Sequence, residues 1–129
     1  MLTLVAAILL IAHAAIHLGF LARPPTTASG PAWPFELDRS GILGRLGVGR
    51  RGARRVGILL VMVLVTAYLG AALALAGMAP WPVALRGVAI GSVVSATLLT
   101  LFFHRWLVVG VAIDLGLLIL VASDWRLTG

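Results

Sequence analysis

The chain has 129 residues, of which 61% are hydrophobic, and its formal net charge is +6 because ten basic residues outnumber four acidic ones. Soluble domains contain about 45–50% apolar residues, so this composition excludes an ordinary soluble domain. There is no cysteine, which excludes disulfide scaffolds, iron–sulfur clusters and thiolate zinc sites.

Long apolar runs follow one another along the chain. They cover residues 2–22, 56–77, 83–103 and 106–122. A helix needs about 20 mostly apolar residues to cross the hydrocarbon core of a bilayer, and the runs are close to that length. The first run has no positive charge before its apolar core, unlike a secretory signal, so we interpret it as a retained helix. The sequence therefore predicts an all-α membrane protein with a single membrane domain over residues 1–129.

The connections predict how these helices are arranged. A loop at 23–55 follows the first run, whereas only a few residues separate the later runs. Connections this short join antiparallel neighbours, so we predict an antiparallel bundle of four transmembrane helices. Within the long loop, Ser40 precedes a segment suited to a short interfacial helix that its side chain would cap.

The basic residues, all of them arginine, predict the orientation in the membrane. Seven lie in loop 23–55 and Arg105 lies in the last turn. The positive-inside rule places these connections in the cytoplasm and both termini outside, in the cytoplasmic (inner) membrane of a bacterium. Five arginines near the second run predict an anchor on anionic lipid headgroups: Arg45, Arg50, Arg51, Arg54 and Arg55. Nucleic-acid or phosphate binding is the alternative explanation of this charge, but we expect the lipid bilayer as partner and no nucleic acid.

Polar residues inside the runs gather at one depth. With a rise of about 1.5 Å per residue, His13 and Asp114 both lie roughly 13 Å from the cytoplasmic end, Thr66 about 15 Å and Ser95 about 12 Å. Asp114 is the one acid inside a run, and burying it in a bilayer costs several kcal/mol unless it finds a partner. We therefore predict a midplane polar layer of these four residues with a His13–Asp114 contact, which either fixes the helix register or carries function.

Small residues recur at helical spacing and predict close helix packing. The positions are Gly87, Gly91 and Ser95 in the third run, Gly70 in the second and Gly110 in the fourth. Such stripes let helix backbones approach one another, here within the bundle, with dimerisation as the alternative.

Two histidines, His13 and His17, are one helical turn apart and share a helix face. Such a pair could hold a metal ion, alone or with Asp114, but no acid lies between them as in zinc proteases. His104 lies about 7 Å shallower than His17, which makes it an awkward second haem ligand. We therefore expect no cofactor, with haem or a divalent metal at these residues as the alternative.

The sequence resembles small bacterial four-helix membrane proteins of unknown role. The matching segments are His13 to Phe20, with its two histidines and Gly-Phe, then Asp38-Arg39-Ser40, and finally His104-Arg105-Trp106-Leu107 through Ile113-Asp114. This resemblance implies a four-helix membrane fold over most of the chain and brings no established activity.

Three functions are consistent with these features. The first is a non-enzymatic accessory or assembly protein that binds partner helices, within a homodimer or a larger membrane complex. The second is a proton-coupled small-solute transporter centred on His13 and Asp114, for which a dimer is expected. The third is a haem- or metal-binding redox protein that uses His13 and His17. The sequence has no catalytic or nucleotide-binding signature, which argues against an enzyme.

Overall fold

A computed structural model describes residues 1–22 and 34–128 of the chain. In this part every regular element is a helix. The α-helices are α1 (Leu2–His17), α2 (Gly41–Arg45), α3 (Arg50–Leu75), α4 (Trp81–Leu101) and α5 (Val108–Thr128), and the 3-10 helices are η1 (Leu18–Leu21) and η2 (Arg105–Leu107). The all-helical prediction is therefore confirmed.

Three helical segments, namely α1 with η1, α3 and α4, are long and apolar enough to cross a membrane. At most 39% of the residues in the most apolar window of each segment are buried. Apolar side chains are exposed on all three segments, for example Ile8, Leu59 and Ile90, which is stable where the surroundings are lipid. These helices indicate a membrane protein.

Two helix boundaries differ from those predicted. Helix α3 begins at Arg50, six residues before the apolar run at 56. Arginine is a good helix former, so the charged first turn is helical, but a prediction from hydropathy alone does not include charged residues. Helix α5 continues beyond residue 122 to Thr128. The predicted short helix is α2, and the Ser40 side chain caps it by accepting a hydrogen bond from the Leu43 amide at 3.2 Å.

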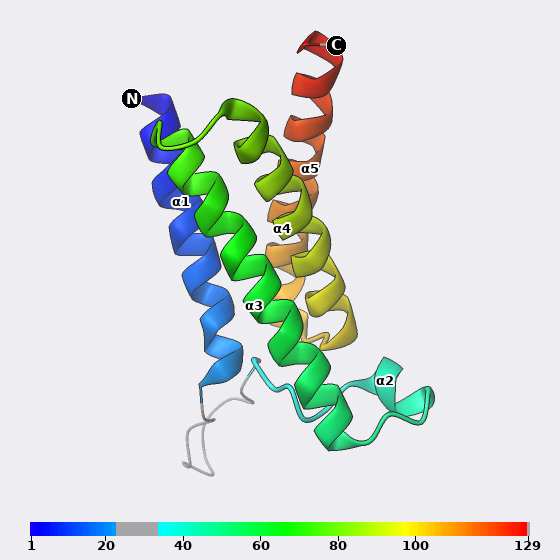
Figure 1. The fold of residues 1–129 in the computed structure, drawn as a ribbon. Coiled ribbons are helices and arrows are strands. Elements are labelled where there is room, and N and C mark those ends of the chain that lie inside the picture. The colour runs from blue at the N-terminus through cyan, green and yellow to red at the C-terminus, as the bar shows by residue number, and fades with distance from the viewer. Residues whose placement is uncertain (23–33, 129) are drawn as a thin grey trace.

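The long helices pack in the order α1, α3, α4, α5, so α1 and α5 lie at the two edges of this arrangement. The start of α1 and the end of α5 lie at one end of the molecule, and α2 lies at the other (Figure 1). Consecutive long helices run in opposite directions (Figure 1).

Glycines allow the central pair, α3 and α4, to approach closely. A Cβ on Gly87 would lie 2.7 Å from the Ala67 carbonyl oxygen, so this position accepts no larger residue without a backbone shift. A Cβ on Gly110 of α5 would lie 2.8 Å from Leu99 Cδ1 in α4. Gly70 is different, because a Cβ there would meet nothing within 4 Å, and the expectation that it mediates packing is wrong.

The segment from Pro34 to α2 covers the end of the bundle opposite the termini (Figure 1). Leu37 is buried and contacts Gly57, where an added Cβ would lie 2.5 Å from Leu37 Cδ2. The Ser40 hydroxyl donates to the carbonyl oxygen of Leu101 at 2.5 Å, which satisfies a backbone group at the end of α4. This segment is thereby fixed beneath α3 and α4.

Candidate functional site

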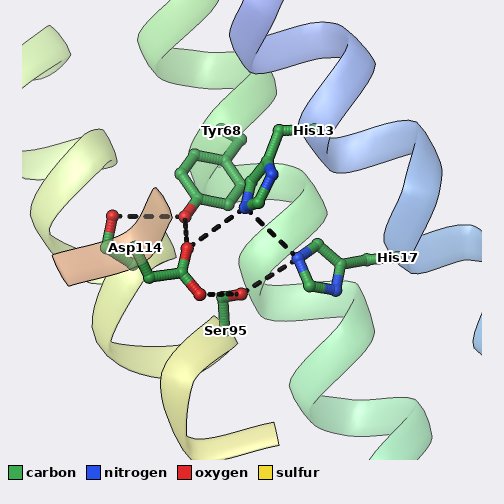
Figure 2. A network of polar contacts seen from close by, with 6 residues as sticks. His13, His17, Tyr68, Ser95 and Asp114 are labelled. Atoms are coloured by element: carbon green, nitrogen blue, oxygen red, sulfur yellow. Dashed lines mark hydrogen bonds and ion pairs between the residues drawn. The ribbon is translucent and has the colours of Figure 1, made fainter. Parts of the chain in front are cut away.

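Asp114, from the first half of α5, is fully buried at the centre of a set of polar side chains (Figure 2). Its Oδ1 accepts a hydrogen bond from the Tyr68 hydroxyl of α3 at 2.7 Å, and its Oδ2 accepts one from the Ser95 hydroxyl of α4 at 2.5 Å. The Tyr68 hydroxyl also lies 3.2 Å from Ser92 Oγ. Each of these four residues has 0% exposed surface.

Both histidines of α1 reach this centre, because residues four apart share one helix face (Figure 2). His13 Nε2 lies 3.1 Å from Asp114 Oδ1, and His17 Nε2 lies 2.9 Å from Ser95 Oγ. The two Nε2 atoms lie 3.4 Å apart. We call these six residues the polar cluster: His13, His17, Tyr68, Ser92, Ser95 and Asp114. It connects α1, α3, α4 and α5.

The hydrogen atoms of the cluster can be followed from one group to the next. Since Ser95 donates to Asp114, its oxygen is left to accept from His17, which must then carry a hydrogen on Nε2. His13 likewise donates from Nε2 when Asp114 is ionised. Two N–H groups then face each other across 3.4 Å, so this contact is not a hydrogen bond in that arrangement. When His13 carries hydrogens on both ring nitrogens, passing its Nε2 proton to Asp114 leaves a neutral ring with a lone pair on Nε2, which relieves the opposition.

The second nitrogen of the His17 ring is buried without a hydrogen-bond partner among the described residues. With a hydrogen on Nε2, a neutral His17 has a free lone pair on Nδ1, and a charged one has an unused N–H there. Buried polar atoms are nearly always paired, so an unpaired one calls for an explanation.

A cavity of about 220 Å³ adjoins the two histidines on the side of α1 that faces α5. Apart from the histidines its lining is mostly apolar and includes Ile16 of α1, Leu99 of α4 and Ile113 of α5. Phe35, from the segment before α2, closes one side and contacts Phe20 edge to face at 5.1 Å between ring centroids. The polar cluster therefore borders a space that an apolar molecule can occupy.

Of the predicted midplane layer, the structure brings His13, Ser95 and Asp114 together and leaves Thr66 out. Thr66 is exposed, so its place in the layer is wrong. Tyr68, two residues later and about 200° further around the helix, faces inward instead. The sequence offered one signal for Tyr68, since it is the single tyrosine of the chain and lies within an apolar run.

His104 lies in the turn between α4 and η2, outside the polar cluster. In residues 1–22 and 34–128, no group of three or more His, Cys, Asp or Glu side chains is arranged to hold a metal ion.

Ser95 and His17 are close enough for a nucleophile and its general base. Such a pair also needs a third group that orients the imidazole, and His17 Nδ1 has none among the described side chains. The imidazole, carboxyl and hydroxyl groups of the cluster are also types that can bind protons and pass them to one another.

The predicted headgroup anchor lies at the end of the molecule that carries α2. All five arginines, which are Arg45, Arg50, Arg51, Arg54 and Arg55, are exposed on α2 and the first turns of α3. Arg54 Nη1 lies 3.7 Å from Asp38 Oδ1, an ion pair between exposed groups.

With this geometry established, we compared the chain with known proteins. No family model, curated protein or solved structure matches it. Only the site itself therefore indicates what the protein does.

Proposed function

We propose that this protein is a small carrier of the bacterial cytoplasmic membrane that couples the passage of a small solute to a proton held in the polar cluster. In this proposal α5 is the fourth transmembrane helix, because residues 108–122 hold no charge except Asp114. The arginine-rich end with α2 lies in the cytoplasm and both termini lie outside, following the positive-inside rule.

One observation carries the proposal. The buried carboxyl group of Asp114 contacts the imidazole of His13, and in the same polar cluster two N–H donors, on His13 and His17, face each other. A polar cluster that only fixes helix register is most stable when every polar atom in it has a hydrogen-bond partner. Here His13 and His17 oppose one another at Nε2, and His17 Nδ1 has no partner in the described part of the chain. Intramembrane ionisable groups of this kind mark proton relays and substrate pathways.

The position of the cavity supports coupling. His13 and His17 belong to both the cluster and the cavity lining, so a bound solute alters the surroundings of the groups that hold the proton. Helices α1 and α5, which flank the cavity, are the edge helices of the arrangement. They can therefore move apart without separating the glycine-packed pair α3 and α4.

The test uses the purified protein in liposomes that contain a pH-sensitive dye. Solutes of different classes (a small amine, a monocarboxylate, a sugar and a phenol) are added outside in turn, and the dye reports coupled proton movement. We expect at least one class to move protons through the wild type and not through Asp114→Asn. If folded, inserted wild-type protein never exceeds protein-free liposomes, the carrier proposal is wrong.

An accessory role is the second candidate, and one observation favours it. Among the long helices, α1 packs closely only on α3, and its outward side chains, such as Ile8 and Leu9, are exposed. A partner helix could cover this face. For this role we expect Asp114→Asn and His13→Ala to lower the amount of assembled protein while no solute moves protons through the wild type.

A further inference from the structure

We propose that the cavity beside His17 binds a small hydroxylated aromatic ring, of the phenol class, that enters from the membrane. The proposal concerns binding alone and does not depend on whether the bound molecule is transported. It is based on the size of the cavity, its opening and the hydrogen bond that His17 lacks.

The size and lining of the cavity fit a single ring. An apolar protein cavity of about 150 Å³ accommodates benzene, so a volume of about 220 Å³ leaves room for a ring with one or two substituents. The aliphatic residues Leu99, Leu107 and Ile113 form much of the wall. Phe35 offers an aromatic surface, and aromatic pairs gain about 0.5–1.5 kcal/mol beyond the burial of area.

The opening lies on the outer surface of the helices. Three lining residues are also exposed there, with 57% of Ile16, 67% of Val109 and 44% of Ile113 accessible. In a membrane this surface faces lipid, so a molecule dissolved in the bilayer reaches the cavity between α1 and α5 without crossing the cytoplasm. Rings with one polar group concentrate near the membrane–water interface, the level at which α1 ends and α5 begins.

His17 determines which polar group the ring carries. Its Nε2 holds a hydrogen that is donated to Ser95, so in the neutral imidazole Nδ1 is an acceptor. This nitrogen is buried, lacks a partner among the described residues and belongs to a residue that lines the cavity. In Figure 2 the second nitrogen of His17 lies on the ring edge turned away from Asp114 and Ser95. A hydroxyl donor that reaches this nitrogen, once the side chains that cover it make room, satisfies it, whereas a methyl group does not.

The experiment exploits the small number of histidines. The chain has three, so protein labelled with ¹⁵N-histidine in nanodiscs shows only three imidazoles, and His104→Gln assigns the one outside the cluster. The probes are 4-fluorophenol and 4-fluorotoluene, which differ by a hydroxyl in place of a methyl group. We expect 4-fluorophenol to shift the His17 ring signals saturably and leave His104 unchanged, and 4-fluorotoluene to bind about tenfold more weakly.

Matched variants distinguish the cavity from general partitioning into lipid. Ile16→Trp fills the cavity from its exposed edge, and Ile8→Trp makes the same change on α1 at a residue that is also 57% exposed but does not line the cavity. We expect the first to abolish the saturable shift and the second to preserve it. Ile113→Trp repeats the block from α5 should Ile16→Trp not fold.

The proposal is overturned by equal shifts with the two probes, or by an unchanged shift in both blocking variants. The NMR result is separate from the liposome result. Saturable phenol binding with no proton movement for any of the solutes contradicts the carrier proposal and supports this one, whereas proton movement with a different solute and no phenol binding does the reverse.

Discussion

Gly91 of α4 lies against the ring of Tyr68 in α3, and a Cβ built on Gly91 would come within 2.7 Å of Tyr68 Cε1. The absence of a side chain at one residue thus creates the space for the other. Because the Tyr68 hydroxyl donates to Asp114, this close approach also determines where the phenol meets the carboxylate. Helix packing and the geometry of the polar cluster are therefore coupled.

We expect Gly91→Ala to destabilise the protein by about 1–3 kcal/mol, the usual cost of overpacking a core. The added methyl group must push away Tyr68, which is fully buried. Reversible unfolding in detergent micelles measures the difference.

The control for this change is Gly70→Ala in α3, where a Cβ meets nothing within 4 Å. There we expect stability to be unchanged or slightly higher, because alanine is the better helix former. Equal losses for the two variants would show that the contact between Gly91 and Tyr68 is not the cause.

The comparison of Thr66 with Tyr68 shows how far the sequence allows the site to be predicted. Counting residues from a helix end gives depth, and depth alone suffices to match His13 with Asp114. It does not give the rotation of a helix about its axis. In a helix that is apolar on every side, no amphipathic pattern reveals that rotation, so depth predicts an inward Thr66 although the residue is exposed.

The helices themselves were easier to predict than the groups that connect them. Long apolar runs indicate spans because a bilayer requires them, and Ser40 before Gly41 is a recognisable N-cap. The bond from Ser40 to the Leu101 carbonyl joins residues 61 apart in the chain, and no local pattern encodes it. The same holds for the cavity, which exists only once α1, α4 and α5 are assembled.

We expect Ser40→Ala to cost about 1–2 kcal/mol, because it removes the cap of α2 and leaves the Leu101 carbonyl without this donor. Faster hydrogen exchange at the Leu43 amide reports the loss of the cap directly. Ser123→Ala is the matched control, since the Ser123 hydroxyl donates only to its own helix, at Ile119 O. Protection of Leu43 equal to wild type in Ser40→Ala would contradict this account.

We expect the purified protein to retain no stoichiometric zinc or iron and to show no haem absorption. The reason is that, among the described residues, no three His, Cys, Asp or Glu side chains are arranged to hold one ion. Metal analysis after dialysis against a chelator, together with a visible spectrum, checks this. One bound metal per chain that disappears in His17→Gln would contradict it.

Asp114→Asn is expected to cost about 3 kcal/mol or more, although it hardly changes the size of the side chain. Tyr68 and Ser95 each donate to a different carboxylate oxygen, and His13 approaches the same oxygen as Tyr68. An amide has only one oxygen, so its NH₂ group must face at least one of these donors in a fully buried site.

The matched change on the same helix is Asp124→Asn. Asp124 accepts from Trp81 Nε1 at 3.1 Å near the end of α5, where the interaction is exposed, and we expect a loss of about 0.5 kcal/mol or less. Unfolding in detergent compares the two variants. If they lose similar stability, the carboxylate of Asp114 is not the acceptor on which the cluster depends, and the proton-binding role proposed for it fails as well.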